Sequence, residues 1–89
     1  MVNYKIVLTK QAEKDKAKVA NIPALKKNAQ EILNLLMNDP FTTPPIYEQL
    51  QGELKGAFSR RLNRQHRIVY QVFEEEKIIK IIRMWTHYE

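Results

Sequence analysis

Several side chains in the second half of the chain have the types needed to cut RNA without a metal ion. Such a reaction needs a base for the ribose 2′-OH, an acid for the departing 5′-oxygen, and cations that stabilise the charged five-coordinate phosphate. Glu48 is a candidate base, and His87 is a candidate acid. Tyr88 could donate a hydrogen bond to the phosphate or stack against a base. The candidate phosphate-binding cations are Arg67 together with Arg61 or Arg60.

Each of these residues also has a plainer structural interpretation. A lone Glu in a polar loop is usually a solvated surface charge, and arginines in strands often lie at solvated sheet edges. A His two residues from the end of a chain is usually inert. We expect His66 to be a strand-start residue without a role, and Trp85 to pack against the core rather than bind a base. Residue spacing alone is therefore a weak signal for catalysis.

Two helices are predicted in the N-terminal half, after a strand at residues 2–8. Thr9 can cap a helix at Lys10–Ala20, which is rich in good helix formers but has a thin apolar face, so we expect it to be mostly solvated. Pro23 suits the first turn of a second helix, which should end at Asn38, because Pro40 disfavours a helical residue before it. Its apolar stripe comprises Leu25, Ala29, Ile32, Leu33 and Leu36.

The C-terminal half is predicted to be β-structure. Residues 41–49, with Pro44 and Pro45, are expected to form a loop. Strands are expected at residues 54–62, 66–73 and 78–85, in an antiparallel meander. The fold class is therefore α+β, in the order βααβββ, with both helices on one face of a small antiparallel sheet. On the middle strand, Arg67 falls on the opposite face from Ile68 and Tyr70, so it should point to the open face if those two point to the helices.

Composition narrows the functional classes. The chain has 89 residues, a net charge of +5, two His and no Cys, so we expect one domain over residues 1–89 without disulfides, cofactors or metal. The basic charge favours polyanionic partners such as RNA or DNA, or an acidic protein. No signal peptide is recognised, and no apolar segment approaches the roughly 20 residues of a membrane helix, so a cytoplasmic protein is expected.

Two neighbouring segments resemble a known signature. The run 56–62, Gly-Ala-Phe-Ser-Arg-Arg-Leu, and the run 66–70, His-Arg-Ile-Val-Tyr, are similar to the motif of the Txe/YoeB toxins of the RelE superfamily. Upstream, Glu48 stands where that family has its catalytic Glu, and His87-Tyr88 matches the family's terminal His-Tyr. The chain departs from the pattern at Gln49, where some relatives have Pro, and at Glu89, which extends beyond the tyrosine.

The resemblance implies an endoribonuclease of a bacterial toxin–antitoxin system, an mRNA interferase with a RelE-like, microbial-RNase-like fold. Glu48 would be the general base, His87 the general acid, Arg67 the phosphorane-stabilising cation, and Tyr88 would complete the site. The implied partners are the ribosome with its mRNA and a cognate antitoxin, in a complex that binds operator DNA. A homodimer and a heteromeric complex both stay open. The alternatives are a non-catalytic basic module that binds RNA or the ribosome, and a co-repressor that mainly partners an antitoxin.

Overall fold

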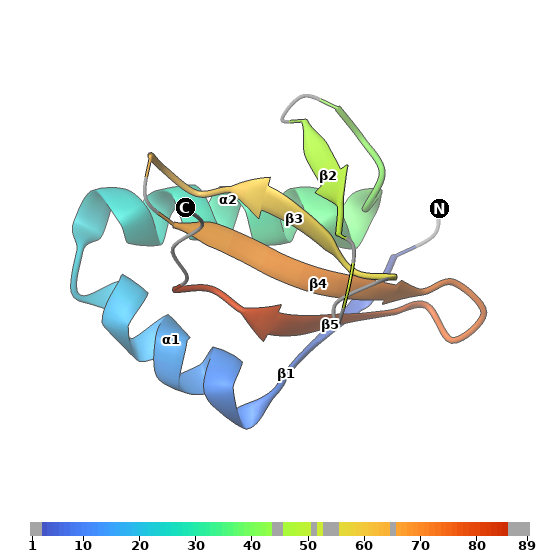
Figure 1. Cartoon of the computed structure of the whole chain (residues 1–89), viewed down its shortest axis with the longest axis horizontal. Helices are drawn as coiled ribbons and strands as arrows, with labels where there is room; N and C mark the ends of the chain where they lie inside the picture. The colour runs from blue at the N-terminus through green and yellow to red at the C-terminus, as the bar shows by residue number, and fades with distance from the viewer. Residues whose placement is uncertain (1–2, 44–45, 51, 53–55, 65, 86–89) are drawn as a thin grey trace.

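The protein, seen here as a computed structural model, is described over residues 3–43, 46–50, 52, 56–64 and 66–85 (Figure 1). The elements, in chain order, are β1 (Lys5–Leu8), α1 (Lys10–Ala20), α2 (Pro23–Asn38), β2 (Tyr47–Gln49), β3 (Phe58–Arg61), β4 (Arg67–Phe73) and β5 (Ile78–Arg83). Within the described residues the sheet has five strands in the order β1-β5-β4-β3-β2. Strand β1 runs parallel to β5, and the other neighbouring pairs are antiparallel. The α+β class is confirmed.

One strand was not predicted. Residues 41–49 were expected to form a loop, but Tyr47–Gln49 pairs with β3 as an edge strand, with Glu48 opposite Ser59. A three-residue strand is too short for an alternating pattern to be visible in the sequence. Its support is tertiary, because the rings of Phe41, Tyr47 and Phe58 pack edge to face with centroids 5.6 to 6.0 Å apart. The expected loop is therefore wrong over its last three residues.

The two predicted helices are confirmed, and the first is tied to the sheet at its start. The Thr9 hydroxyl oxygen accepts a hydrogen bond from Ala12 N–H at 3.0 Å, which satisfies a free donor of the first turn. The same hydroxyl donates to the carbonyl of Ile82 at 3.1 Å. Pro23 occupies the first turn of α2 as expected. Strand β5, expected to reach residue 85, ends at Arg83, after a register irregularity between Val69 and Tyr70 on β4.

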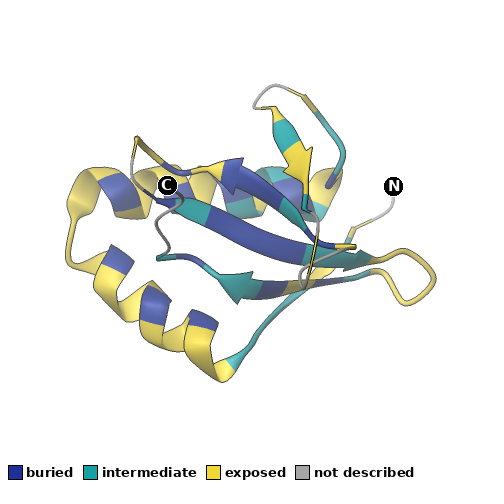
Figure 2. Ribbon diagram, viewed as in Figure 1, coloured by how far each residue is buried: buried dark blue, intermediate teal, exposed yellow. Residues whose placement is uncertain are grey.

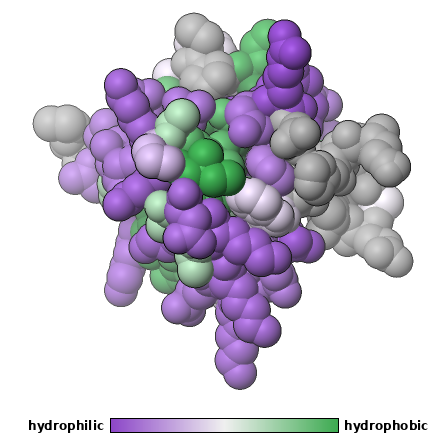
Figure 3. All heavy atoms as spheres, turned by 90° about the vertical axis from the view of Figure 1, so that its left-hand side faces the viewer, coloured by the Kyte–Doolittle hydropathy of each residue, from purple (hydrophilic) through white to green (hydrophobic). Residues whose placement is uncertain are grey.

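The core lies between the helices and one face of the sheet. The apolar stripe of α2 packs behind the central strands, while α1 adds a thin buried edge and is otherwise exposed (Figures 1 and 2). The residues that meet there include Leu25, Ala29, Ile32, Leu36, Ile68, Tyr70, Ile79 and Ile81. Side chains at the end of the molecule where α1 leads into α2 are predominantly hydrophilic, around one small hydrophobic patch (Figure 3). In the described part of the chain, neither helix could cross a membrane.

Candidate active site

The Arg67 and Glu48 side chains meet across three neighbouring strands. Arg67 Nη1 lies 2.8 Å from Glu48 Oε1, and the same nitrogen donates to Ser59 Oγ at 3.2 Å. Strand pairing explains the meeting, because Glu48 on β2 lies opposite Ser59 on β3, which in turn lies opposite Val69 on β4, two residues beyond Arg67. Side chains separated by two residues on a strand share a face. The unpredicted strand β2 is thus what brings Glu48 to Arg67.

This cluster lies on the face of the sheet opposite the helices. Ile68 and Tyr70 belong to the core, whereas Arg67 turns to Glu48, so the predicted orientation of β4 is confirmed. Ser59 and Val69 on this face are almost fully buried. The Arg67 side chain is 18% exposed and that of Glu48 is 59% exposed. The Arg67 guanidinium is therefore mostly buried, whereas solvent or substrate can reach the Glu48 carboxylate.

Arg60 does not belong to this surface. The residue is fully buried, its Nε donates to Tyr70 Oη at 2.9 Å, and its Nη2 donates to the Pro40 carbonyl at 2.8 Å. Its guanidinium carbon also lies 5.0 Å from the centre of the Tyr47 ring. The phosphate-binding role expected for Arg60 is corrected to a structural one, because strand alternation turns this side chain away from Arg67 and into the protein.

Burial also affects Tyr70, the partner of Arg60. Burial raises the pKa of the Tyr70 hydroxyl, and the Arg60 guanidinium beside it opposes that rise without cancelling it. The hydroxyl therefore stays protonated and donates to the Pro40 carbonyl at 3.4 Å. Arg60 and Tyr70 together fasten β3 and β4 to the segment that follows α2.

Arg61 is the arginine of this pair that reaches solvent. It is exposed at the end of β3, directly opposite Arg67 in the strand register. It also borders a groove between α2 and the end of β3, where Asn28 Nδ2 donates to the Leu62 carbonyl at 3.0 Å. Arg61 is therefore placed to add positive charge beside Arg67.

His87 and Tyr88, the remaining candidates, lie outside the described residues, as does Glu89. The described chain nevertheless ends close to Arg67. Arg83 is the register partner of Val69 on β4, and the Trp85 ring stacks on the ring of His66, with centroids 3.9 Å apart. The chain thus runs toward the start of β4 as it approaches the segment that contains His87.

Ser59 is a site residue that sequence reasoning missed. It stands within the recognised motif, between Phe58 and Arg60, but the sequence shows no partner for its hydroxyl. Its hydrogen bond to Arg67 depends on the register of β3 against β4. Among the residues that the structure describes, no three His, Asp or Glu are grouped to hold a metal ion.

Comparison with known proteins decides the family. The family model described as "YoeB-like toxin of bacterial type II toxin-antitoxin system" matches residues 9–88. The chain belongs to the YoeB-like toxins. Toxin YoeB of Mycobacterium bovis is 36% identical over 70 residues, which cover 75% of this chain and 80% of that protein. Toxin YoeB of a Synechocystis strain is 32% identical over 69 residues, covering 78% of each chain.

Solved structures of YoeB-like toxins share the whole fold. The YoeB/ParE toxin from Agrobacterium tumefaciens superposes with a TM-score of 0.86 at 25% identity, covering 94% of this chain and 99% of that one. The YoeB of a heterotetrameric YoeB-YefM complex from Staphylococcus aureus superposes with a TM-score of 0.82 at 29% identity, covering 98% and 100%. This chain is therefore a toxin of a type II toxin–antitoxin system with the RelE-like α+β fold.

Proposed function

We propose that this YoeB-like toxin cuts mRNA in the ribosomal A site by general acid–base catalysis. The observation that carries the proposal is the 2.8 Å contact between Arg67 and Glu48 on the face of the sheet opposite the helices. It places a carboxylate able to accept a proton beside a cation able to bind a phosphate, which is the pairing that RNA cleavage through the 2′-OH requires.

Each residue of the site has a defined step. Glu48 removes the proton from the ribose 2′-OH, and the 2′-oxygen attacks the adjacent phosphorus. His87 gives a proton to the 5′-oxygen as the P–O5′ bond breaks, leaving a 2′,3′-cyclic phosphate and a free 5′-OH. Arg67, with Arg61 beside it, stabilises the charge on the five-coordinate phosphate, and Tyr88 donates a hydrogen bond to it or stacks on a base.

The ion pair between Arg67 and Glu48 does not obstruct this chemistry. Glu48 is largely exposed, and ion pairs with an exposed partner contribute only about 0–1 kcal/mol. A phosphate can therefore replace the carboxylate at Arg67 at little cost. Ser59 keeps the guanidinium in place through its own hydrogen bond when Glu48 turns toward the 2′-OH.

An antitoxin is the proposed protein partner. Two of the matching structures are YoeB-YefM complexes from Staphylococcus aureus. Acidic side chains of an antitoxin would pair with Arg67 and Arg61 and compete with the RNA phosphate. The same complex is proposed to bind operator DNA through further positive charge.

A non-catalytic basic module is the second candidate function, and the net charge of +5 favours it independently of the site. Such a module would bind RNA or the ribosome through its lysines and arginines. Its binding would weaken with salt and would not depend on Glu48. The catalytic toxin also predicts such binding, so the two functions are separated by whether cutting is seen and is lost in Glu48→Gln.

The test is a primer-extension map of mRNA from cells in which the toxin is expressed without antitoxin. We expect new 5′ ends within translated codons, and their loss in Glu48→Gln, Arg67→Ala and His87→Ala. Removing the base or the acid should slow cutting by roughly 100-fold or more. Glu74→Gln is the matched control, because it removes an exposed carboxylate from the turn between β4 and β5. Full toxicity of all three site variants would refute the assignment.

A further inference from the structure

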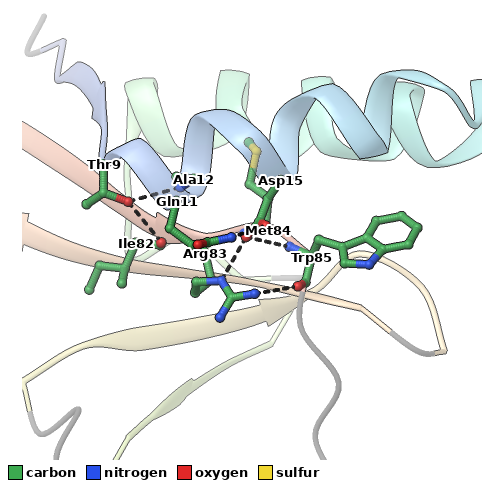
Figure 4. Close-up of polar contacts among 8 residues, drawn as sticks. All are labelled: Thr9, Gln11, Ala12, Asp15, Ile82, Arg83, Met84 and Trp85. Carbon is green, nitrogen blue, oxygen red and sulfur yellow. Dashed lines mark hydrogen bonds and ion pairs between the residues drawn. The ribbon is translucent and has the colours of Figure 1, made fainter.

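Asp15 is a buried carboxylate that the proposed chemistry does not use. It lies on α1, a helix otherwise mostly exposed, and its side chain is only 1% exposed. Burying a carboxylate is unfavourable unless charged and hydrogen-bonding partners surround it. Figure 4 shows where those partners come from: the Asp15 side chain points from the helix to the end of β5.

One oxygen of Asp15 holds three consecutive residues. Oδ2 accepts hydrogen bonds from Arg83 Nε at 2.8 Å, from Met84 N–H at 3.1 Å and from Trp85 N–H at 3.2 Å. Oδ1 accepts from Gln11 Nε2 at 3.0 Å, which fixes the rotation of the carboxylate. The path of the backbone where β5 ends is therefore set by directional bonds to α1.

A further hydrogen bond lies within the same segment, between Arg83 and Trp85. Arg83 Nη2 donates to the Trp85 carbonyl at 3.0 Å, so the guanidinium bridges Asp15 and the last described residue (Figure 4). We call the contacts of Asp15 with residues 83–85 the α1 clamp.

The opposite side of this segment rests on the start of β4. The Trp85 ring stacks on His66 with an interplanar angle of 24°, and His66 is 3% exposed and directly precedes Arg67. The α1 clamp and this stack hold Trp85 from two directions. The stacking partner, His66, is the sequence neighbour of Arg67 in the candidate site.

We infer that Asp15 is a positioning residue for the C-terminal His87 and Tyr88. The inference rests on the proposed function, in which His87 is the acid. Only two peptide units separate Trp85 from His87, and two residues of chain reach at most about 7 Å. Asp15 thus fixes the point from which the chain continues to the acid, and misplacement of a catalytic group by about 1 Å can cost roughly 100-fold in rate.

Asp15→Asn is the first test, because it keeps the size of the side chain but removes its charge and one of its two acceptor oxygens. Single-turnover cleavage of ribosome-bound mRNA should slow by roughly tenfold or more, while KM stays within about twofold. Two variants of the same helix are controls. Glu13→Gln removes an exposed carboxylate, and Val19→Ala weakens the core without removing a hydrogen bond of the α1 clamp.

Trp85 provides a readout that does not depend on catalysis, because it is the single tryptophan of the chain. In Asp15→Asn we expect red-shifted emission, stronger quenching by acrylamide and faster exchange of the Trp85 amide. Val19→Ala, at an equal loss of stability, should leave all three unchanged. If Asp15 contributed only to overall stability, the two variants would give the same Trp85 signals, and that result would overturn the inference.

The outcomes separate this inference from the proposed function. A wild-type toxin that cuts no ribosome-bound mRNA refutes the function, and unchanged Trp85 signals in Asp15→Asn then also refute the clamp. A wild-type toxin that cuts, with Asp15→Asn as fast as Val19→Ala, refutes the inference alone. If Asp15→Asn fails to fold, Arg83→Gln takes its place, because the Arg83 side chain is 39% exposed and its loss removes one arm of the clamp. It should slow cutting with KM unchanged, and wild-type rates would overturn the inference.

Discussion

Arg67 donates through Nη1 to both Glu48 Oε1 and Ser59 Oγ, and its planar guanidinium is the group proposed to bind the phosphate. We predict that Arg67→Lys behaves almost like Arg67→Ala in cleavage. An ammonium keeps the charge but lacks the planar fork that matches two phosphate oxygens. Loss of such a donor should lower kcat by roughly 100-fold, as measured under single-turnover conditions on ribosome-bound mRNA. Cutting by Arg67→Lys at the wild-type rate would mean that the guanidinium supplies charge alone.

Arg60 and Arg61 are neighbours in the sequence with opposite surroundings. Arg60→Ala should lower the free energy of unfolding by about 3 kcal/mol, because Tyr70 Oη and the Pro40 carbonyl lose a charged donor in a buried place. Arg61→Ala should change it by less than about 0.5 kcal/mol, because that side chain is exposed. Urea unfolding of both variants measures the difference. Equal losses would contradict the placement of Arg60 in the interior.

The Asp15 carboxyl predicts a specific sensitivity to acid. Burial alone would raise its pKa, but the hydrogen bonds from Arg83, Met84 N–H, Gln11 and Trp85 N–H together hold the pKa below its ordinary value of 3.8. A depressed folded-state pKa contributes stability that is fully present above the unfolded value and is lost as the pH falls through the folded one.

The measurement is the free energy of unfolding of wild type minus that of Asp15→Asn, as a function of pH. This difference should be constant between about pH 5 and pH 8 and should shrink below about pH 4. Val19→Ala, which weakens the core on the same helix and removes no ionisable group, should show no such loss. A difference that persists unchanged to lower pH would show that Asp15 is not held as an anion.

At the scale of elements, the sequence predicted the two helices because their starts and ends depend on nearby residues. The Thr9 cap, the Pro23 start and the apolar stripe of α2 all act within a few residues, and the helices were predicted with their observed bounds. Strand β2 and the α1 clamp depend on contacts between distant residues, such as Glu48 with Ser59 and Asp15 with Met84. A single sequence does not display those pairings. The contact of Glu48 with Arg67 therefore could not be predicted before the fold was known.

Strand β2 also carries an element-scale prediction. Phe41→Leu removes an aromatic ring whose edge-to-face contacts reach Tyr47 on β2 and Phe58 on β3. Each such contact contributes about 1 kcal/mol beyond area burial, so β2 should detach more readily. We expect faster amide exchange at Glu48 and slower cutting, with the α2 amides unchanged. Protected β2 amides in Phe41→Leu would show that strand pairing alone holds Glu48.

At the scale of the whole molecule, the charge of +5 should govern association with RNA, whereas the candidate site should govern the rate of cleavage. Affinity for ribosome-bound mRNA should therefore fall with salt, while the cleavage rate at saturation should hardly change, because Arg67 is mostly shielded from solvent. If about three phosphates are neutralised on a single strand, affinity falls roughly 20-fold for an about fourfold rise in salt. Glu48→Gln should keep that salt dependence while losing cleavage, since in the proposed mechanism Glu48 acts on the proton and not on the phosphate. A salt-independent affinity would place recognition in shape and hydrogen bonding instead of in the net charge.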